Sequence, residues 1–344
     1  MSSTTEAHET TPLTDIFDTK DDQNIPIGNN EKWGDDIKEK NERTLRLYFQ
    51  NINGLSTAEL TEDWMDIYTI MEDHNVDIYG LAETNITWTP TVTHNLHSKL
   101  RLYNGGGSNQ IKMSQSSCDD PTLSTYQPGG VCQVARNKVV GRIGKYGNDP
   151  HSLGRWAYMT IQGRKGVKVV VATVYRLSQS SKPDGYRTAY NQQYRHLRRQ
   201  GIQNPEPKSQ LCKDLLIQVN IWKKDSEVII MIDANDDMDN TEWANFVTRA
   251  ELYDVMGMKH GHNSPSTYIK GTKTIDYILA TSKVAESVTA CGMFPYQTGI
   301  VTDHRGLWID MDIPQLLKGG ISPIHENLQQ RPKCKQKERC KKLD

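Results

Sequence analysis

The sequence lacks any hydrophobic run long enough to cross a membrane and lacks the start of a secreted protein. Its 344 residues are 36% hydrophobic, which suffices for a packed core, yet no apolar run in the sequence approaches the about 18 residues of a transmembrane helix. The first residues, MSSTTEAHETTPLTD, are polar and acidic and have neither the basic nor the apolar region of a signal peptide. These absences favour an intracellular protein that has no membrane partner.

Cysteine is scarce and scattered. The chain has six cysteines, with no C-x-x-C pair and no histidine at zinc-finger spacing, so we expect reduced thiols rather than a disulfide framework or a structural zinc site. The glycine-rich stretch NGGGSN at 104–109 has no following Lys-Ser/Thr and is therefore not a nucleotide-binding P-loop.

Net charge is also nearly absent, at −1. Residues 1–40 hold 4 basic and 10 acidic residues without apolar periodicity, whereas residues 315–344 hold 8 basic and 3 acidic ones. We predict a disordered acidic segment at 1–40, one domain at 41–315 and a basic flexible tail at 316–344. The tail suggests a nuclear signal or a nucleic-acid arm, so the predicted location is the nucleus rather than the cytoplasm; a plain disordered tail is the alternative.

What is present is a series of strand-like and helix-like segments. Alternating apolar residues predict a strand at 44–50, and a helical pattern follows at 56–75. Further strands are expected in VDIYGLAET, VCQVA, VVGRIG, RWAYMTIQG, VKVVVATVY, SEVIIMID, TIDYILA and LWIDMDI, with helices near 185–200, 208–224 and 241–250 and a long loop at 104–130. Groups of strands with interspersed helices predict two packed sheets covered by helices.

Polar residues stand at the ends of several of these strands. The run IIMIDANDD ends in Asp233 and Asn235; taken alone, such an end is more often a turn than a site. Asp276 lies between apolar neighbours, where an unpaired carboxylate is costly to bury. Similar positions are held by Asn51, Asn53, Glu83, Tyr175, Arg176, Asp303 and His304. Together they supply what phosphodiester hydrolysis needs, because oxygen ligands suit Mg²⁺ and polar groups stabilise charge on phosphoryl oxygens.

The order of these motifs resembles the endonuclease/exonuclease/phosphatase superfamily, which includes DNase I and the apurinic endonucleases. Over about residues 44–314 the chain is most similar to the endonucleases of non-LTR retrotransposons. The resemblance implies an α+β fold, namely a four-layer α/β/β/α sandwich of two mixed β-sheets flanked by helices. The motifs are QNINGL (50–55), GLAETN (80–85), ATVYR (172–176), IDAND (232–236), KTIDYIL (273–279) and TDH (302–304).

The resemblance implies a metal site in the first two motifs and in TDH. Glu83 is the expected principal ligand of Mg²⁺, with Mn²⁺ as the alternative ion, and Asn51 and Asp303 are expected beside it. Asn53 stands where some members have an acid, so we assign it to the substrate phosphate rather than to the metal.

The other motifs imply catalytic groups. Asp233 would position or deprotonate the attacking water, Asn235 would bind the scissile phosphate, and Tyr175 would lie near that phosphate. Asp276 would orient His304, which would act as acid/base or electrostatic stabiliser. Members often read Y-x-P-N, whereas this chain continues with Arg176, Leu177 and Ser178; Arg176 or Ser178 would then substitute for the missing Asn.

The predicted function is a Mg²⁺-dependent endonuclease of retrotransposon type that nicks DNA as a monomer. One alternative keeps the fold with RNA or another phosphoester as substrate, as in an RNA deadenylase or an inositol-phosphate phosphatase. A second alternative is a nucleic-acid-binding remnant without catalysis. The arginine-rich stretch at 187–199 fits a phosphate-backbone contact, with a solvated helix face as the other interpretation.

Overall fold

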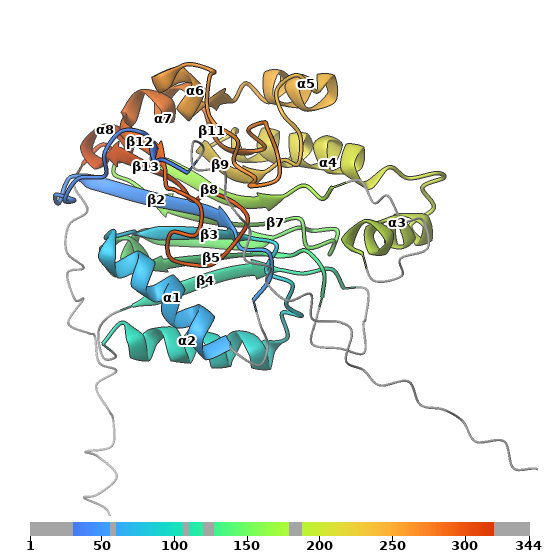
Figure 1. The fold of residues 1–344 in the computed structure, drawn as a ribbon, viewed down its shortest axis with the longest axis horizontal. Helices are drawn as coiled ribbons and strands as arrows, with labels where there is room; N and C mark the ends of the chain where they lie inside the picture. The colour runs from blue at the N-terminus through green and yellow to red at the C-terminus, as the bar shows by residue number, and fades with distance from the viewer. Residues whose placement is uncertain (1–29, 56–59, 106–109, 120–126, 179–187, 320–344) are drawn as a thin grey trace, which may run out of the picture.

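Two β-sheets form the centre of the protein (Figure 1). The structure is a computed structural model that describes residues 30–55, 60–105, 110–119, 127–178 and 188–319. The seven-stranded sheet has the order β1 (Trp33–Gly34), β12 (Val288–Met293), β13 (Leu307–Asp312), β2 (Thr44–Asn51), β3 (Ile78–Ala82), β5 (Val131–Arg136) and β4 (Ile111–Ser116). The six-stranded sheet has the order β10 (Tyr253–Asp254), β11 (Asp276–Ala280), β9 (Glu227–Asp233), β8 (Lys168–Tyr175), β7 (Trp156–Gln162) and β6 (Ile143–Asn148).

Both sheets are mixed. β2 pairs with β3 in parallel, as β8 does with β9, and the other strand pairs of the two sheets are antiparallel. The carboxyl ends of each parallel pair therefore meet at one edge of their sheet. The antiparallel neighbours β11 and β13 begin at that same edge, because their first residues pair with the ends of β9 and β2.

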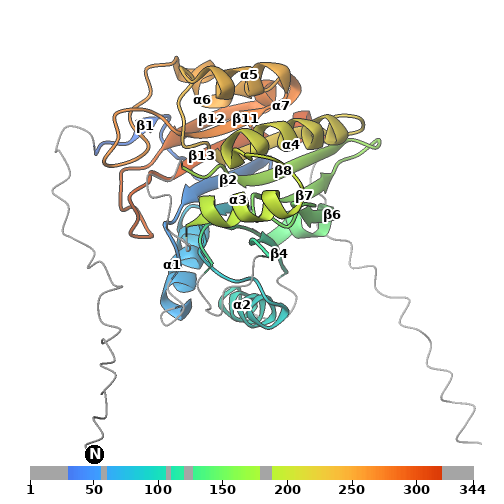
Figure 2. The same ribbon diagram turned by 90° about the vertical axis from the view of Figure 1, so that its right-hand side faces the viewer.

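Helices cover the outer face of each sheet (Figure 2). Helices α1 (Leu60–Asp73) and α2 (Pro90–Tyr103) pack on the seven-stranded sheet, and α4 (Pro207–Trp222) and α5 (Thr241–Arg249) pack on the six-stranded sheet. Helix α3 (Ala189–Arg199) lies beside α4, while α6 (Val255–His260), α7 (Ser282–Ser287) and α8 (Ile313–Leu317) complete the described helices. This arrangement confirms the predicted four-layer α/β/β/α sandwich.

The alternating pattern of β2 explains how the layers are filled. Leu45, Leu47 and Phe49 are fully buried between the two sheets, whereas Tyr48 points the other way, into the core under α1. Successive side chains of a strand face opposite sides, and each fully buried Leu or Phe contributes about 1.5–3 kcal/mol. A one-residue slip of β2 would exchange these two faces, so the pattern fixes the register.

Several element predictions were wrong or incomplete. The predicted loop at 104–130 contains the edge strand β4. Two of its four buried residues are the serines Ser114 and Ser116, so the strand lacks an apolar alternation that the sequence could reveal. The stretch VVGRIG begins as a 3₁₀ helix, η2 (Asn137–Arg142), since the adjacent Val139 and Val140 both enter the core between the sheets. Helix α2 and strand β12 were not recognised, although Thr89 caps α2 and Leu96 and Leu100 form its buried face.

The predicted N-terminal boundary at residue 41 is also too late. Trp33 and Gly34 form β1 and pair with Met293 and Gly292 on β12. Residues 30–40 therefore belong to the folded domain, and α8 extends it beyond residue 315. The rest of the predicted acidic segment and basic tail, 1–29 and 320–344, lies outside the described residues. Within the described part of the chain, no helix has the length and apolar character that a membrane span requires.

Candidate active site

The predicted site residues meet where the strand ends of the two sheets converge. Asn51 and Asp233 are the last residues of β2 and β9, and Asp276 is the first residue of β11. Glu83 follows β3, and His304 precedes β13. Because β2 and β3 lie in one sheet and β9 and β11 in the other, the site is assembled between the two sheets.

Asp233 is at the centre of this group and is 1% exposed. It is paired in register with Asp276 on β11 and with Tyr175 on β8. Its Oδ2 accepts a hydrogen bond from Asn51 Nδ2 at 2.7 Å, and its Oδ1 accepts one from the backbone N–H of Asn235 at 2.9 Å. Burial, together with the nearby Asp276 carboxylate, raises the pKa of Asp233 to about 8. In its ionised form, a carboxylate with a raised pKa is a stronger proton acceptor than an ordinary aspartate.

Asn235 is held by the turn that follows β9. Its backbone has a φ of 49°, in the left-handed region that Asn tolerates better than most residues. The side-chain Nδ2 donates to the Arg176 carbonyl at 2.8 Å and to Asp233 Oδ2 at 3.2 Å. The amide is thus fixed beside Asp233 with both of its hydrogens engaged, and its phosphate-binding role stays a prediction.

His304 and Asp276 form a buried pair. His304 Nδ1 and Asp276 Oδ2 are 2.8 Å apart, and the two residues are 6% and 1% exposed. Burial lowers the pKa of His304, but the charges of Asp276, Asp233 and Asp303 outweigh burial and raise it to about 10. The imidazole therefore carries its proton at neutral pH, with Nε2 as a charged hydrogen-bond donor.

Residues that were not predicted hold this pair in place. Gln50 Nε2 donates to the His304 carbonyl at 3.1 Å, and Thr267 Oγ1 accepts the Asp276 backbone N–H at 3.1 Å. Tyr79 O–H donates to Gln50 Oε1 at 3.0 Å from the neighbouring strand. Neither Gln50 nor Thr267 carries a sequence signal that distinguishes it from an ordinary core or loop residue.

Glu83 and Asp303 are the carboxylates predicted to hold an ion. Burial raises the pKa of Glu83, hydrogen bonds from Asn51 and Tyr175 and the charge of His304 lower it, and the charge of Asp303 raises it further. Glu83 is also held in the left-handed region, with a φ of 54°. Hard oxygen donors that carry excess negative charge fit a divalent cation such as Mg²⁺. The donors present therefore suit the predicted ion.

A second group of donors is less suited to an ion. Single ligand atoms of Asp233, Asp276 and His304 lie within 4.8 Å of one another. His304 and Asp276 already share a hydrogen bond, and a protonated imidazole cannot ligate a metal. The placement of the ion at Glu83 and Asp303 stays a prediction.

Asn51 and Asn53 make contacts that the sequence did not predict. Asn51 Nδ2 bridges Asp233 and Glu83, at 2.7 and 3.0 Å, and its Oδ1 accepts the Asn53 backbone N–H at 2.8 Å. Asn51 thus positions both acids, and its metal-ligand role stays a prediction. Asn53 is exposed, and its Nδ2 lies 3.4 Å from Asp303 Oδ2.

Tyr175 and its neighbour Arg176 point in opposite directions, as successive residues of a strand must. Tyr175 is buried on the inter-sheet side, and its hydroxyl bonds Glu83. Arg176 is 1% exposed and faces the outer helix layer, where it pairs with Asp236 and with Glu242 Oε2, the latter at 3.0 Å. The prediction that Arg176 contacts the substrate phosphate is therefore wrong.

We expect Arg176→Ala to destabilise the protein by about 3 kcal/mol, because it leaves a cavity where a side chain only 1% exposed was packed and removes its ion pairs with Asp236 and Glu242. Chemical denaturation measures this change. The exposed Arg198→Ala on α3 is the matched control and should change stability by less than about 0.5 kcal/mol. A phosphate-binding role would instead predict weaker substrate binding at unchanged stability.

Two further residues of the sequence motifs, Ser178 and Lys273, lie at the surface. Ser178 is exposed three residues beyond Tyr175, and its contact with phosphate stays a prediction. Lys273, which replaces an Arg of the family motif, pairs with Asp237 and with Asp239, the latter at 3.2 Å. Lys273 therefore stabilises the loop after β9 through ion pairs at the surface.

Comparison with solved structures defines the class of fold. The AP endonuclease LMAP from Leishmania major matches with a TM-score of 0.56 and 12% identity, over 78% of this chain and 88% of that chain. The 3′ phosphatase NExo from Neisseria, bound to product DNA hairpin, matches with a TM-score of 0.51 and 15% identity, over 78% and 99%. The human Nocturnin catalytic domain, with bound sulfate anion, matches with a TM-score of 0.50 and 16% identity, over 78% and 93%.

These likenesses establish the DNase I-like fold of endonuclease/exonuclease/phosphatase proteins. No known family of sequences matches the chain, and no curated protein matches it. The resemblance read from the motifs is therefore confirmed at the level of the fold.

Proposed function

We propose that the protein is a Mg²⁺-dependent phosphodiesterase that cuts nucleic acid, and specifically an endonuclease that nicks DNA. The observation that carries this proposal is the buried contact of Asp233 with Asn51, Asn235 and the Asp276–His304 pair, next to Glu83. A proton acceptor, a charged donor and an oxygen-rich ion site thus lie together at one edge of the sheets. The DNA named with the Neisseria phosphatase supports the choice of DNA as substrate.

The chain's own residues divide the work of hydrolysis. Asp233 would orient the attacking water and take its proton, while Asn51 and Asn235 keep the Asp233 carboxylate in place. His304, protonated through Asp276, would donate from Nε2 to the phosphate, and Asn235 would donate to it by giving up its longer bond to Asp233 Oδ2. Glu83 and Asp303 would hold Mg²⁺, whose chemistry is to offset the negative charge of the phosphate.

The motif order supports a narrower assignment. We assign the chain to the type of the non-LTR retrotransposon endonucleases, in which a nick in DNA is the product. RNA cleavage, phosphate removal from an inositol phosphate and binding without catalysis are the alternatives. Relative rates on plasmid DNA, poly(A) and inositol phosphates separate these activities.

We expect the intact chain to convert supercoiled plasmid to nicked circles with Mg²⁺, and a chelator to abolish this activity because Glu83 and Asp303 need the ion. Gel electrophoresis of the plasmid measures the conversion. Mn²⁺ should restore the chelated protein. If protein with Mg²⁺ or Mn²⁺ leaves plasmid, poly(A) and inositol phosphates untouched, the enzymatic proposal fails.

A further inference from the structure

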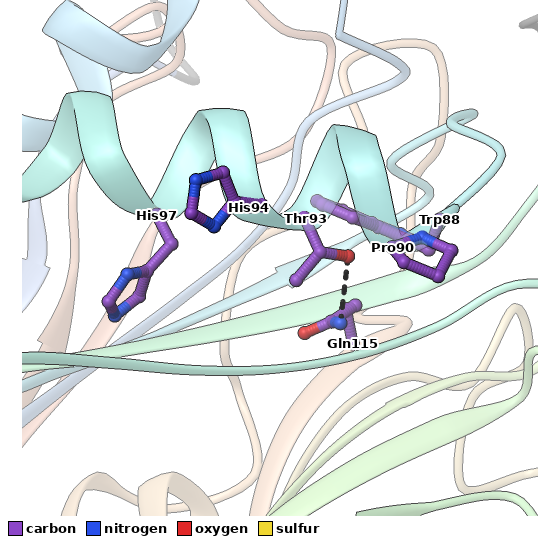
Figure 3. A pocket seen from close by; sticks show the side chains of 6 residues that line it. All are labelled: Trp88, Pro90, Thr93, His94, His97 and Gln115. Atoms are coloured by element: carbon purple, nitrogen blue, oxygen red, sulfur yellow. Dashed lines mark hydrogen bonds between the residues drawn. The ribbon is translucent and has the colours of Figure 1, made fainter.

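A groove separate from the acidic site runs between α2, β4 and β6. One cavity of about 480 Å³ lies against α2 beside Trp88, His94 and His97, as Figure 3 shows. A second cavity, of about 360 Å³, is lined by Lys112 and Tyr146 among others, and both cavities share His97. We call the two together the α2 groove. Each volume falls in the range of about 300–1,000 Å³ that ligand sites occupy.

The α2 groove is suited to an anion. No Asp or Glu lines either cavity, and helix α2 contains no acidic residue. Lys112 Nζ bonds the Ile143 carbonyl at 2.7 Å, and His97 Nε2 lies 3.0 Å from the Ile111 carbonyl, so the lysine cation and the imidazole are fixed along the groove. His94 makes no hydrogen bond within the described part of the chain and is left to meet a ligand. Cations without carboxylates favour a phosphate backbone.

Aromatic rings stand at both ends of the α2 groove. Trp88 is held by its Nε1–H bond to Thr84 Oγ1 at 3.2 Å and by an edge contact with Trp64, whose ring centroid is 6.3 Å away. Tyr146 on β6 is 58% exposed. Fixed or exposed rings beside cations are the elements on which single-stranded nucleic acid stacks its bases. A duplex cannot use them, because its bases are already stacked on one another.

The α2 groove and the candidate active site are joined by a short stretch of chain. Trp88 comes five residues after Glu83, and its partner Thr84 follows Glu83 directly. From the lining of the groove and this short link, and resting on the proposed function, we propose that the α2 groove binds an unpaired segment of the nucleic acid that is cut. The substrate class is then a duplex with a single-stranded extension, rather than a uniform duplex.

Binding measured without metal tests the groove independently of catalysis. We use the full chain in chelator, with fluorescence anisotropy of a blunt DNA duplex and of the same duplex carrying an oligo-dT extension. Tyr146→Ala/His94→Ala should weaken binding of the extended duplex about tenfold and leave the blunt duplex unchanged. Tyr146→Phe/His94→Ala should bind more tightly than the Ala variant, because the phenyl ring still stacks.

The matched control is Tyr253→Ala/His262→Ala, which removes an exposed Tyr and an exposed His outside the α2 groove. The groove proposal is overturned if groove and control variants bind the extended duplex equally, if the blunt duplex is weakened as much, or if the wild type does not prefer the extension. Cleavage with Mg²⁺ is measured separately on the wild type. If the wild type binds the extended duplex preferentially but does not cleave it, the nuclease proposal is contradicted and the groove proposal is supported.

Discussion

Replacing Asp233 by Asn lowers the turnover of phosphodiester cleavage by about 10²–10⁴-fold, the range that a positioned proton acceptor contributes. Asn keeps the size of the side chain but cannot accept a proton from water. The Oδ1 that accepts the Asn235 backbone N–H is kept, and the amide nitrogen replaces the Oδ2 that accepts from Asn51. One buried hydrogen bond is therefore lost along with the proton acceptor, and the stability of the variant is measured beside its turnover. Initial rates at saturating substrate measure the turnover.

The control for this variant is Asp239→Asn, which changes an exposed acid in the same loop. Its side chain contacts only Lys273 among the described residues, so turnover should stay within about twofold, as for most exposed substitutions. Thermal unfolding of both variants shows whether the fold is intact. Equal rates for Asp233→Asn, Asp239→Asn and wild type would remove Asp233 from the mechanism.

Replacing His304 by Ala lowers turnover by about 10²–10³-fold, as expected for the loss of one charged donor to the phosphate. Asp276→Asn should lower turnover as well, since the carboxylate no longer holds the imidazolium. The double variant Asp276→Asn/His304→Ala should be little worse than His304→Ala alone. If Asp276 acts only through His304, its loss has no further effect once His304 is gone. Additive losses would contradict a role of Asp276 through His304.

The pH profile of Asp276→Asn tests the same pair in another way. In the wild type the pKa of His304 is raised to about 10, so the protonated donor is present below that pH and is lost above it. Without Asp276, burial lowers the pKa and one of the opposing carboxylates is gone. The alkaline limb of turnover should therefore move toward the ordinary histidine value of about 6.5. An unchanged limb would mean that His304 does not titrate in catalysis.

How far each residue could be predicted depends on how local its signal is. The apolar run of β9 and the polar residues after it are contiguous, so Asp233 and Asn235 were readable together with the strand that carries them. The side to which the Arg176 side chain points was not predicted. The alternation of side chains along β8 nevertheless places it on the face opposite Tyr175. Its partner Glu242 lies 66 residues further on, and that pairing follows only from the packing of α5.

Edge elements were harder to predict than central ones. Strand β4 carries Lys112, Ser114 and Gln115 among few apolar residues, and some of its buried positions are serines, so it shows no apolar alternation. Gln50 lies in a strand whose position was predicted, but its bond to His304 joins residues 254 positions apart. The α2 groove likewise depends on how α2, β4 and β6 pack, and none of its residues stood out in the sequence.

The sequence by itself determined the fold class and the set of acids, amides and histidine, because strand periodicity and strand-end residues are local and contiguous. Only the tertiary structure decided which of them face one another: the Asp276–His304 pair, the Asn51 bridge between Asp233 and Glu83, and the burial of Arg176 away from the site. The physical reason is that pKa values and hydrogen bonds depend on distances of a few ångströms between residues far apart in the chain, and packing of the two sheets sets those distances.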